Sequence, residues 1–213
     1  MDVVGHLGPL WDGLLVTLQL TILSFVGALL LGIVLAVMRI SPILPLRVLA
    51  GVYVEVVRNI PLLVLLVIFV FGLPEIGVMY SLFLTVVTAM ALYGAAFVSE
   101  TVRTGVATVS VNEAEAARAL GMTTTQTIWH IILPRALRAM IQPLGNVFIS
   151  ISLSSSLAAA VGVSELTGKT DMINLEYADA GVTLLISGAL YVGITLSGGL
   201  FFGWMERRLA VGQ

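Results

Sequence analysis

The sequence predicts an all-α, polytopic membrane protein with five transmembrane helices, and three observations support this. Of the 213 residues, 59% are hydrophobic and only 10% are charged, against roughly 25% in an average soluble domain. Five apolar stretches are each long enough for the roughly 20 residues that a helix needs to cross a bilayer. Basic residues gather in alternate connections, as in chains that cross a membrane repeatedly. We therefore expect a single transmembrane domain over residues 1–213, solvated largely by lipid.

Apolar runs and the residues that interrupt them define the five spans. The first run carries no charge, the second has Glu55 and Arg58 near its start, and the third contains Glu100. No basic residue precedes the first run, so we expect it to be retained rather than cleaved as a signal peptide. The predicted spans cover about 13–38, 48–73, 80–102, 139–161 and 180–205.

The distribution of basic residues predicts the orientation in the membrane. Arg39 and Arg47 lie in the first connection, four arginines lie in or beside the third, and Arg207 and Arg208 follow the last span. The other two connections contain one basic residue, Lys169, and five acidic residues. Because Lys and Arg are retained on the cytoplasmic side, we expect the N-terminus outside and the C-terminus in the cytoplasm, which an odd number of spans satisfies.

Composition also excludes several classes of function. The net charge of −2 argues against nucleic-acid binding, which needs a clustered basic surface. The absence of cysteine excludes disulfides and thiolate chemistry, and His6 and His130 are too isolated to indicate a metal site. The stretch 162–170 resembles a phosphate-binding loop, but five residues separate its glycines where the motif needs four. We expect no catalytic residue, no metal and no bound cofactor.

The third connection contains a short, well-delimited helix. Asn112 is a suitable N-cap with Glu115 as its reciprocal partner, and Gly121 fits the left-handed position that ends a helix. Thr123 with Gln126 predicts the start of a second helix that leads into the fourth span. A short exposed helix with small side chains suits insertion into a groove of another protein, although an ordinary surface helix has the same features.

The spacing within this connection favours the first interpretation. Glu115-Ala116-Ala117, three residues, Gly121, nine residues, Ile131, one residue and Leu133-Pro134 resemble in full the EAA signature of ABC-importer permeases. The resemblance implies a cytoplasmic coupling loop over about 104–134 that contacts a separate ATPase. The residues expected to carry the coupling are Glu113, Glu115, Ala116, Ala117, Gly121, Leu133 and Pro134.

Four further stretches extend the resemblance to nearly the whole chain. Residues 13–18, 58–62, 97–103 and 155–166 are similar to the polar amino-acid permeases, the histidine, glutamine, glutamate and arginine group, and most of all to glutamate permeases. This implies a type I ABC importer transmembrane fold in the bacterial inner membrane. The implied partners are ABC ATPase subunits that hold the ATP, a second permease subunit and an extracytoplasmic binding protein. Leu153 and Ser154 depart from the family, which often has Lys-Asp or Lys-Asn there.

Charged residues within the spans are candidates for function. Glu55 and Arg58 share a helix face and are predicted to pair, with a gating or substrate role as the alternative. Glu100 and Arg103 have the same spacing, which favours a structural or coupling role near the inner gate. We include Arg58 and Glu100 among the candidate residues of the transport path.

Serines of the fourth span are the other candidates. Ser152, Ser155 and Ser156 share one helical face, which suits either a polar lining of the path or close packing through small residues. Asn146, a lone polar residue in the same span, is expected to form an interhelical hydrogen bond.

Two functions compete with that of a permease. An ion-coupled secondary transporter usually has more spans, an internal repeat and a broken or charged helix at mid-membrane. A membrane scaffold or signalling subunit would use the short helix to bind a partner without transport. The neighbouring genes distinguish these readings, because an importer needs an ATPase and an exported binding protein.

Overall fold

Two long helices that pack against each other form the centre of the fold. The computed structural model describes residues 3–177 and 180–210. Helix α1 (Val3–Ile40) packs lengthwise against α5 (Leu82–Ala107). Small residues allow this approach, because a Cβ placed on Gly32 would lie 2.5 Å from the Cβ of Val98. Such close packing through small residues is characteristic of helices in membranes.

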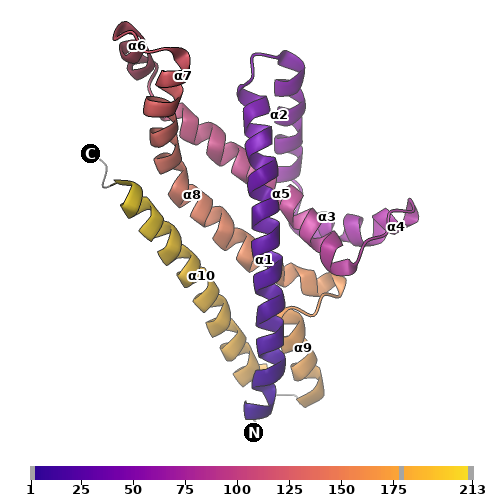
Figure 1. Cartoon of the computed structure of the whole chain (residues 1–213). Coiled ribbons are helices and arrows are strands. Elements are labelled where there is room, and N and C mark those ends of the chain that lie inside the picture. Colours follow the sequence, from indigo (N-terminus) through magenta and orange to yellow (C-terminus); the bar gives the residue numbers. More distant parts are fainter. Residues whose placement is uncertain (1–2, 178–179, 211–213) are drawn as a thin grey trace.

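Two further long helices cover one side of the central pair (Figure 1). Helix α8 (Leu133–Ser154) contacts α1, α5 and α10 (Ala180–Ala210). Phe25, Phe148 and Phe202 meet there edge-on or tilted, with ring centroids 5.2–6.0 Å apart. The apolar core therefore lies between α1, α5, α8 and α10, while many large apolar side chains on the outer faces are exposed, as expected of helices that lipid surrounds.

The second predicted span is broken rather than straight. Helix α2 (Leu44–Arg58) and the helical segment after it meet at an angle of 104°. That segment consists of α3 (Leu62–Val67), the π-helical η1 (Ile68–Gly72) and α4 (Leu73–Glu75). The break follows from Pro61, because proline disfavours the helical conformation of the residue before it. The described residues thus contain four long apolar helices and one bent pair, and they match the five predicted spans when the bent pair is counted as one span.

A continuous helix of four segments, from Thr124 to Val161, contains the fourth span. Helix α7 (Thr124–Thr127) runs through the π-helical η2 (Ile128–Ile132) into α8, and the 3₁₀-helical η3 (Ser155–Val161) follows. Both π-helical segments stand immediately before a Leu-Pro pair, Leu73-Pro74 and Leu133-Pro134. Proline removes one backbone donor and crowds the carbonyl four residues earlier, and the preceding turn widens as a result.

A buried carboxylate fixes the helix α9 (Leu166–Tyr177) to the rest of the fold. Glu165 is fully buried just before α9, and its Oε1 accepts a hydrogen bond from the backbone N–H of Gly168 at 2.9 Å. Its Oε2 accepts hydrogen bonds from the hydroxyls of Thr17 in α1 at 3.2 Å and Tyr191 in α10 at 2.6 Å. The first and last long helices are therefore joined through one side chain.

The connections that are rich in arginine lie at the same end of the molecule. Figure 1 shows α6 (Val111–Ala119), α7 and the turn between α1 and α2 at one end, with the first turns of α1 and α9 at the other. The C-terminal end of α10 also points toward the α6 end. The fold thus brings together the segments that the charge pattern assigns to one side of the membrane.

Candidate functional site

Helix α6 is the short helix that the third connection predicts, but it begins earlier than expected. The N-cap is Ser110, whose hydroxyl accepts a hydrogen bond from the backbone N–H of Glu113 at 3.3 Å. The prediction of Asn112 as the cap is wrong. Ser110, two positions upstream, is also a good capping residue, so the helix begins at Val111 and Asn112 lies within it. Gly121 has φ +85° at the end of α6, and Thr123 with Gln126 forms a capping box on α7, both as predicted.

One face of α6 packs on its own chain. Glu113 forms an ion pair with Arg135 of α8, and Ala117, four residues after Glu113, is only 5% exposed. These two positions anchor the helix to the start of α8. The ion pair has half-exposed partners and contributes about 0–1 kcal/mol, so it sets the direction of α6 more than its stability.

The face of α6 that carries Glu115, about half a turn away from Glu113 and Ala117, is free in this chain. Glu115 is exposed. Ala116 and Leu120 lie on the side toward the start of α8 and are also exposed, Leu120 to 84%. Within the described residues, Glu115 has no hydrogen bond or ion pair through its side chain. Trp129 in η2 adds a large side chain that is 64% exposed. Large exposed apolar side chains near the end of a protein are typical of a binding site for another protein.

A groove of about 480 Å³ separates α6 from the start of α8. Pro134, at the second position of α8, is exposed and lines this groove. Leu133, the first residue of α8, is half-buried behind it. The predicted coupling residues therefore lie around one short helix and one helix start, although they spread over 22 positions of sequence. The residues that line the groove are Glu113, Ala116, Ala117, Leu120, Met122, His130, Ile131, Pro134, Arg135 and Arg138.

Three arginines surround a single carboxylate, that of Glu100, near the C-terminal end of α5. Glu100 forms ion pairs with Arg39 of α1 at 2.6 Å and with Arg103 at 2.5 Å. Arg58, at the end of α2, lies 3.9 Å from the same carboxylate and above the ring of Phe97. Glu100 and Arg103, which the sequence places three residues apart, thus pair on one face of α5. The cluster has a formal surplus of two positive charges.

The predicted pair of Glu55 with Arg58 does not form. Arg58 is the last residue of α2, and its guanidinium turns to Glu100 and Phe97 instead. The face of the Phe97 ring, 5.5 Å from the guanidinium, attracts the cation, and Glu55 offers no such contact. The contact with Glu100 spans 42 positions of sequence, so local spacing does not indicate it.

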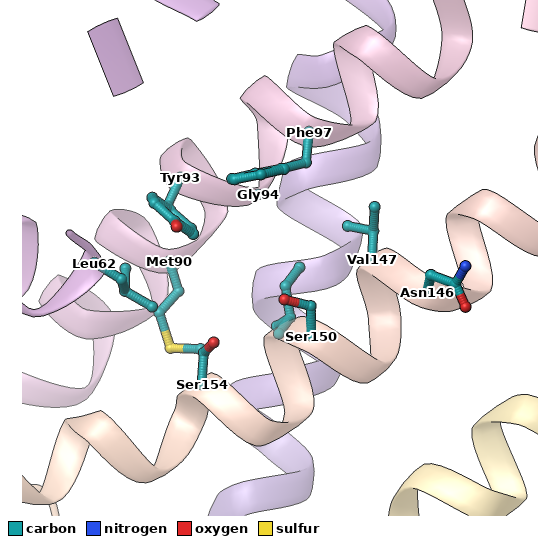
Figure 2. A pocket seen from close by; sticks show the side chains of 10 residues that line it. Leu62, Met90, Tyr93, Gly94, Phe97, Asn146, Val147, Ser150 and Ser154 are labelled. Atoms are coloured by element: carbon teal, nitrogen blue, oxygen red, sulfur yellow. The ribbon is translucent and has the colours of Figure 1, made fainter. Parts of the chain in front are cut away.

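A cavity of about 210 Å³ opens between α5 and α8, beside the start of α3 (Figure 2). Tyr93 and Phe97 of α5 form one wall, with ring centroids 5.0 Å apart. Ser150 and Ser154 of α8 form the facing wall, one helical turn apart. The lining consists of Leu62, Met90, Tyr93, Gly94, Phe97, Asn146, Val147, Ser150, Ile151 and Ser154.

The serines named from the sequence lie mostly away from this cavity. Ser152 and Ser155 are fully buried, and the hydroxyl of Ser155 donates to the carbonyl oxygen of Ser152 at 2.7 Å. Ser156 is half-buried and donates to the carbonyl oxygen of Leu153 at 2.8 Å. The change from α- to 3₁₀-helix at Ser155 explains why an unbroken α-helical wheel misplaces these side chains.

Asn146 has a different place from the one predicted. The expected interhelical hydrogen bond is absent from the described residues, and the exposed side chain lies along the cavity lining. Asn146, Ser150 and Ser154 recur every four residues, so they share one face of α8. This spacing is present in the sequence and identifies the polar face that the predicted serines do not.

Residues 28–211 match a family model described as "Binding-protein-dependent transport system inner membrane component". The probable glutamine ABC transporter permease protein of Bacillus subtilis (strain 168) is 34% identical over the full length of both chains. The glutamate transport system permease protein of Corynebacterium glutamicum is 37% identical and covers 97% of each chain.

Two solved structures of ABC transporters contain chains that are similar in fold to this one. The crystal structure of an amino acid ABC transporter with histidines contains a chain that is 33% identical, with a TM-score of 0.90 and 97% of each chain covered. An inward-facing MetNI methionine ABC transporter is 22% identical, with a TM-score of 0.71 over 98% of this chain and 99% of that one, and this match supports the fold alone.

Proposed function

The chain belongs to the family of binding-protein-dependent transport system inner membrane components, and on that premise we propose that it imports a polar amino acid. It is the membrane-spanning permease of an ABC importer and has a type I importer fold. Relatives named for glutamine and glutamate cover almost the whole chain, and this supports the class of substrate. Family membership removes the secondary transporter and the scaffold as competing functions.

The free face of α6 is the observation that carries the coupling role. We assign Glu115 and Ala116 to the contact with a separate ATPase subunit, because they are exposed while Glu113 and Ala117 hold the helix on its own chain. Ala116 permits close approach of a partner backbone. Leu120 supplies apolar area at the end of the helix. ATP is held and hydrolysed by that partner.

The remaining coupling residues determine how the chain runs from α6 to α8. Gly121 reverses the chain after α6, and Leu133 and Pro134 start α8 beside the groove. Movement of α6 by the ATPase would therefore pass into α8 through Pro134 and the ion pair between Glu113 and Arg135. Since α8 forms one wall of the cavity, a change at α6 reaches the transport path through one helix.

The sides of the membrane follow from this assignment. The α6 end is cytoplasmic, and the α9 end faces an extracytoplasmic binding protein that delivers the substrate. A second permease subunit, identical or related, completes the path. Arg58 and Glu100 lie at the cytoplasmic end of that path, Ser156 lies beside it, and Ser152 and Ser155 pack the wall behind it.

Co-purification tests the coupling role directly. The chain is tagged, expressed with the ATPase encoded beside it, purified, and the amount of bound ATPase is measured. Glu115→Arg is expected to reduce bound ATPase by about tenfold or more, since a charge reversal at a close contact opposes docking. Glu176→Arg is the matched control, because Glu176 is also exposed but lies on α9 at the opposite end. Failure of the unaltered chain to retain any ATPase, or equal retention by both variants, refutes the proposal.

A further inference from the structure

We propose that the cavity between α5 and α8 selects amino acids with polar but uncharged side chains and rejects those with cationic side chains. This inference rests on the proposed function and names the substrate class of the same transport path. It follows from the charge of the cavity lining, the unused hydrogen-bonding groups within it and the charges nearest to it.

The cavity lining carries no formal charge. Its polar side chains are the hydroxyls of Tyr93, Ser150 and Ser154 and the amide of Asn146, and the other six residues that line it are apolar or glycine. Hydroxyl and amide groups both donate and accept hydrogen bonds, so they pair with uncharged polar groups of either kind. At about 210 Å³ the cavity is smaller than the roughly 300–1,000 Å³ of sites for drug-sized ligands, which suits a molecule of amino-acid size.

The four polar groups remain available to a ligand. Ser155 and Ser156 bond through their hydroxyls to backbone carbonyls of their own helix. By contrast, the side chains of Ser150 and Ser154 make no hydrogen bond within the described part of the chain, and the same holds there for Tyr93 and Asn146. Asn146 and Ser150 are exposed, and Tyr93 and Ser154 are half-buried. A ligand that enters the cavity can therefore reach their hydrogen-bonding groups, which no other side chain of the described residues occupies.

A cationic side chain meets no counter-ion in the cavity. Moving an ammonium or guanidinium group from water to an uncharged site is strongly unfavourable. A positive charge also stands beside the wall, since Arg58 lies 5.5 Å from the centroid of the Phe97 ring, which forms part of that wall. The surrounding cluster has three guanidiniums against one carboxylate, that of Glu100. Both the local and the longer-range electrostatics therefore disfavour a cation.

An acidic side chain has no direct partner either. The Phe97 ring stands between the guanidinium of Arg58 and the cavity, and Arg58 is already beside Glu100. The α-ammonium and α-carboxylate groups are common to all amino acids, so their cost cancels when two substrates are compared. Selection then depends on the side chain alone, and the uncharged polar side chain is the one that the lining can satisfy.

Ligand binding to the purified permease–ATPase complex tests this inference without the binding protein, which would impose its own selectivity. The probes are glutamine, lysine and glutamate, measured by calorimetry. Glutamine is expected to bind at least about tenfold more tightly than either charged probe. Comparable binding of lysine or glutamate, or no binding of glutamine, overturns the inference.

Ser154→Asp tests the role of the lining. A carboxylate at this position supplies the missing counter-ion, so lysine binding should strengthen by about tenfold while glutamine binding weakens. Ser164→Asp is the control, since Ser164 is exposed and outside the cavity. Ser150→Asp repeats the test one turn away if the first variant does not fold. Unchanged lysine binding in a folded variant contradicts the inference.

Two further measurements distinguish failure of this inference from failure of the proposed function. Stimulation of ATP hydrolysis by the binding protein and uptake of glutamine are measured on the same preparation. A complex that couples and transports but shows no charge preference refutes the inference alone. A chain that retains no ATPase refutes the proposed function.

Discussion

Gly121 provides the sharpest test of the coupling turn, because its substitution changes the backbone and nothing else. The residue has φ +85°, and a Cβ built on it would have no other atom within 4 Å. A side chain there meets no neighbour in this chain. Any effect within this chain must therefore come from the left-handed backbone conformation that reverses the chain between α6 and α7. The asparagine variant, larger than alanine but better suited to that conformation, separates this effect from a clash with the ATPase.

The expected magnitude follows from that conformation. A non-glycine residue in the left-handed region costs about 1–2 kcal/mol, and asparagine tolerates it better than alanine or a β-branched residue. If the ATPase binds only the observed turn, Gly121→Ala should weaken its binding by a factor of about 5–30. Gly121→Val should have a larger effect and Gly121→Asn a smaller one.

The assay is retention of the ATPase by the purified chain, together with stimulation of ATP hydrolysis by the binding protein. Gly188→Ala is the matched control, because Gly188 lies within helix α10, also has no atom within 4 Å of an added Cβ, and has an ordinary helical φ. This variant should behave as the unaltered chain does. Normal coupling in Gly121→Val, or equal coupling in all three Gly121 variants, would show that the turn is not required.

Three further predictions concern the stability of the membrane domain, measured as thermal unfolding in detergent. Gly32→Ala should destabilise the protein by about 1–3 kcal/mol, since the added methyl group meets Val98 at 2.5 Å, whereas Gly51→Ala, with open space around it, should not. Glu165→Ala should lower the melting temperature by about 5 °C or more, because three donors lose their buried acceptor. Glu100→Gln should destabilise by about 1–3 kcal/mol, because three guanidiniums lose their carboxylate while two of them stay partly solvated.

Each of these predictions has an outcome that contradicts it. Equal melting temperatures for the Gly32 and Gly51 variants would mean that α1 and α5 separate without cost. A Glu165→Ala variant as stable as Ser164→Ala would mean that the carboxylate bears no structural role. An unchanged Glu100→Gln variant would show that the arginines are held by other contacts.

Hydropathy located the five spans, because the length of an apolar run depends on the bilayer and not on tertiary contacts. It did not reveal the 104° break between α2 and α3. The signal was present as Asn59-Ile60-Pro61, since a proline within an apolar run ends or kinks a helix. Hydropathy averaged over a window conceals such a break, because Ile60 and Leu62 on either side of the proline are themselves apolar.

The coupling loop was more accessible to prediction than the cavity. Capping and helix termination are local, so Gly121 and Thr123 could be placed from their neighbours in sequence. Even there, Ser110 displaced Asn112 as the cap, because two capping residues competed within three positions. The partner of Arg58 depends on how separate helices meet, which no local pattern contains. The polar face of α8 was present in the sequence as Asn146, Ser150 and Ser154, but its place beside the cavity depends on how α8 packs against α5.

The hydrogen bonds of Glu165 impose an order on the biogenesis of the protein. The carboxylate needs Thr17, near the start of the chain, and Tyr191, in the last helix to leave the ribosome. Until that helix is inserted, Glu165 lacks one of its donors and must stay in contact with water or the lipid headgroups. The α9 end of the bundle therefore closes last, and a truncated chain that lacks the final helix would leave this end open to cellular quality control.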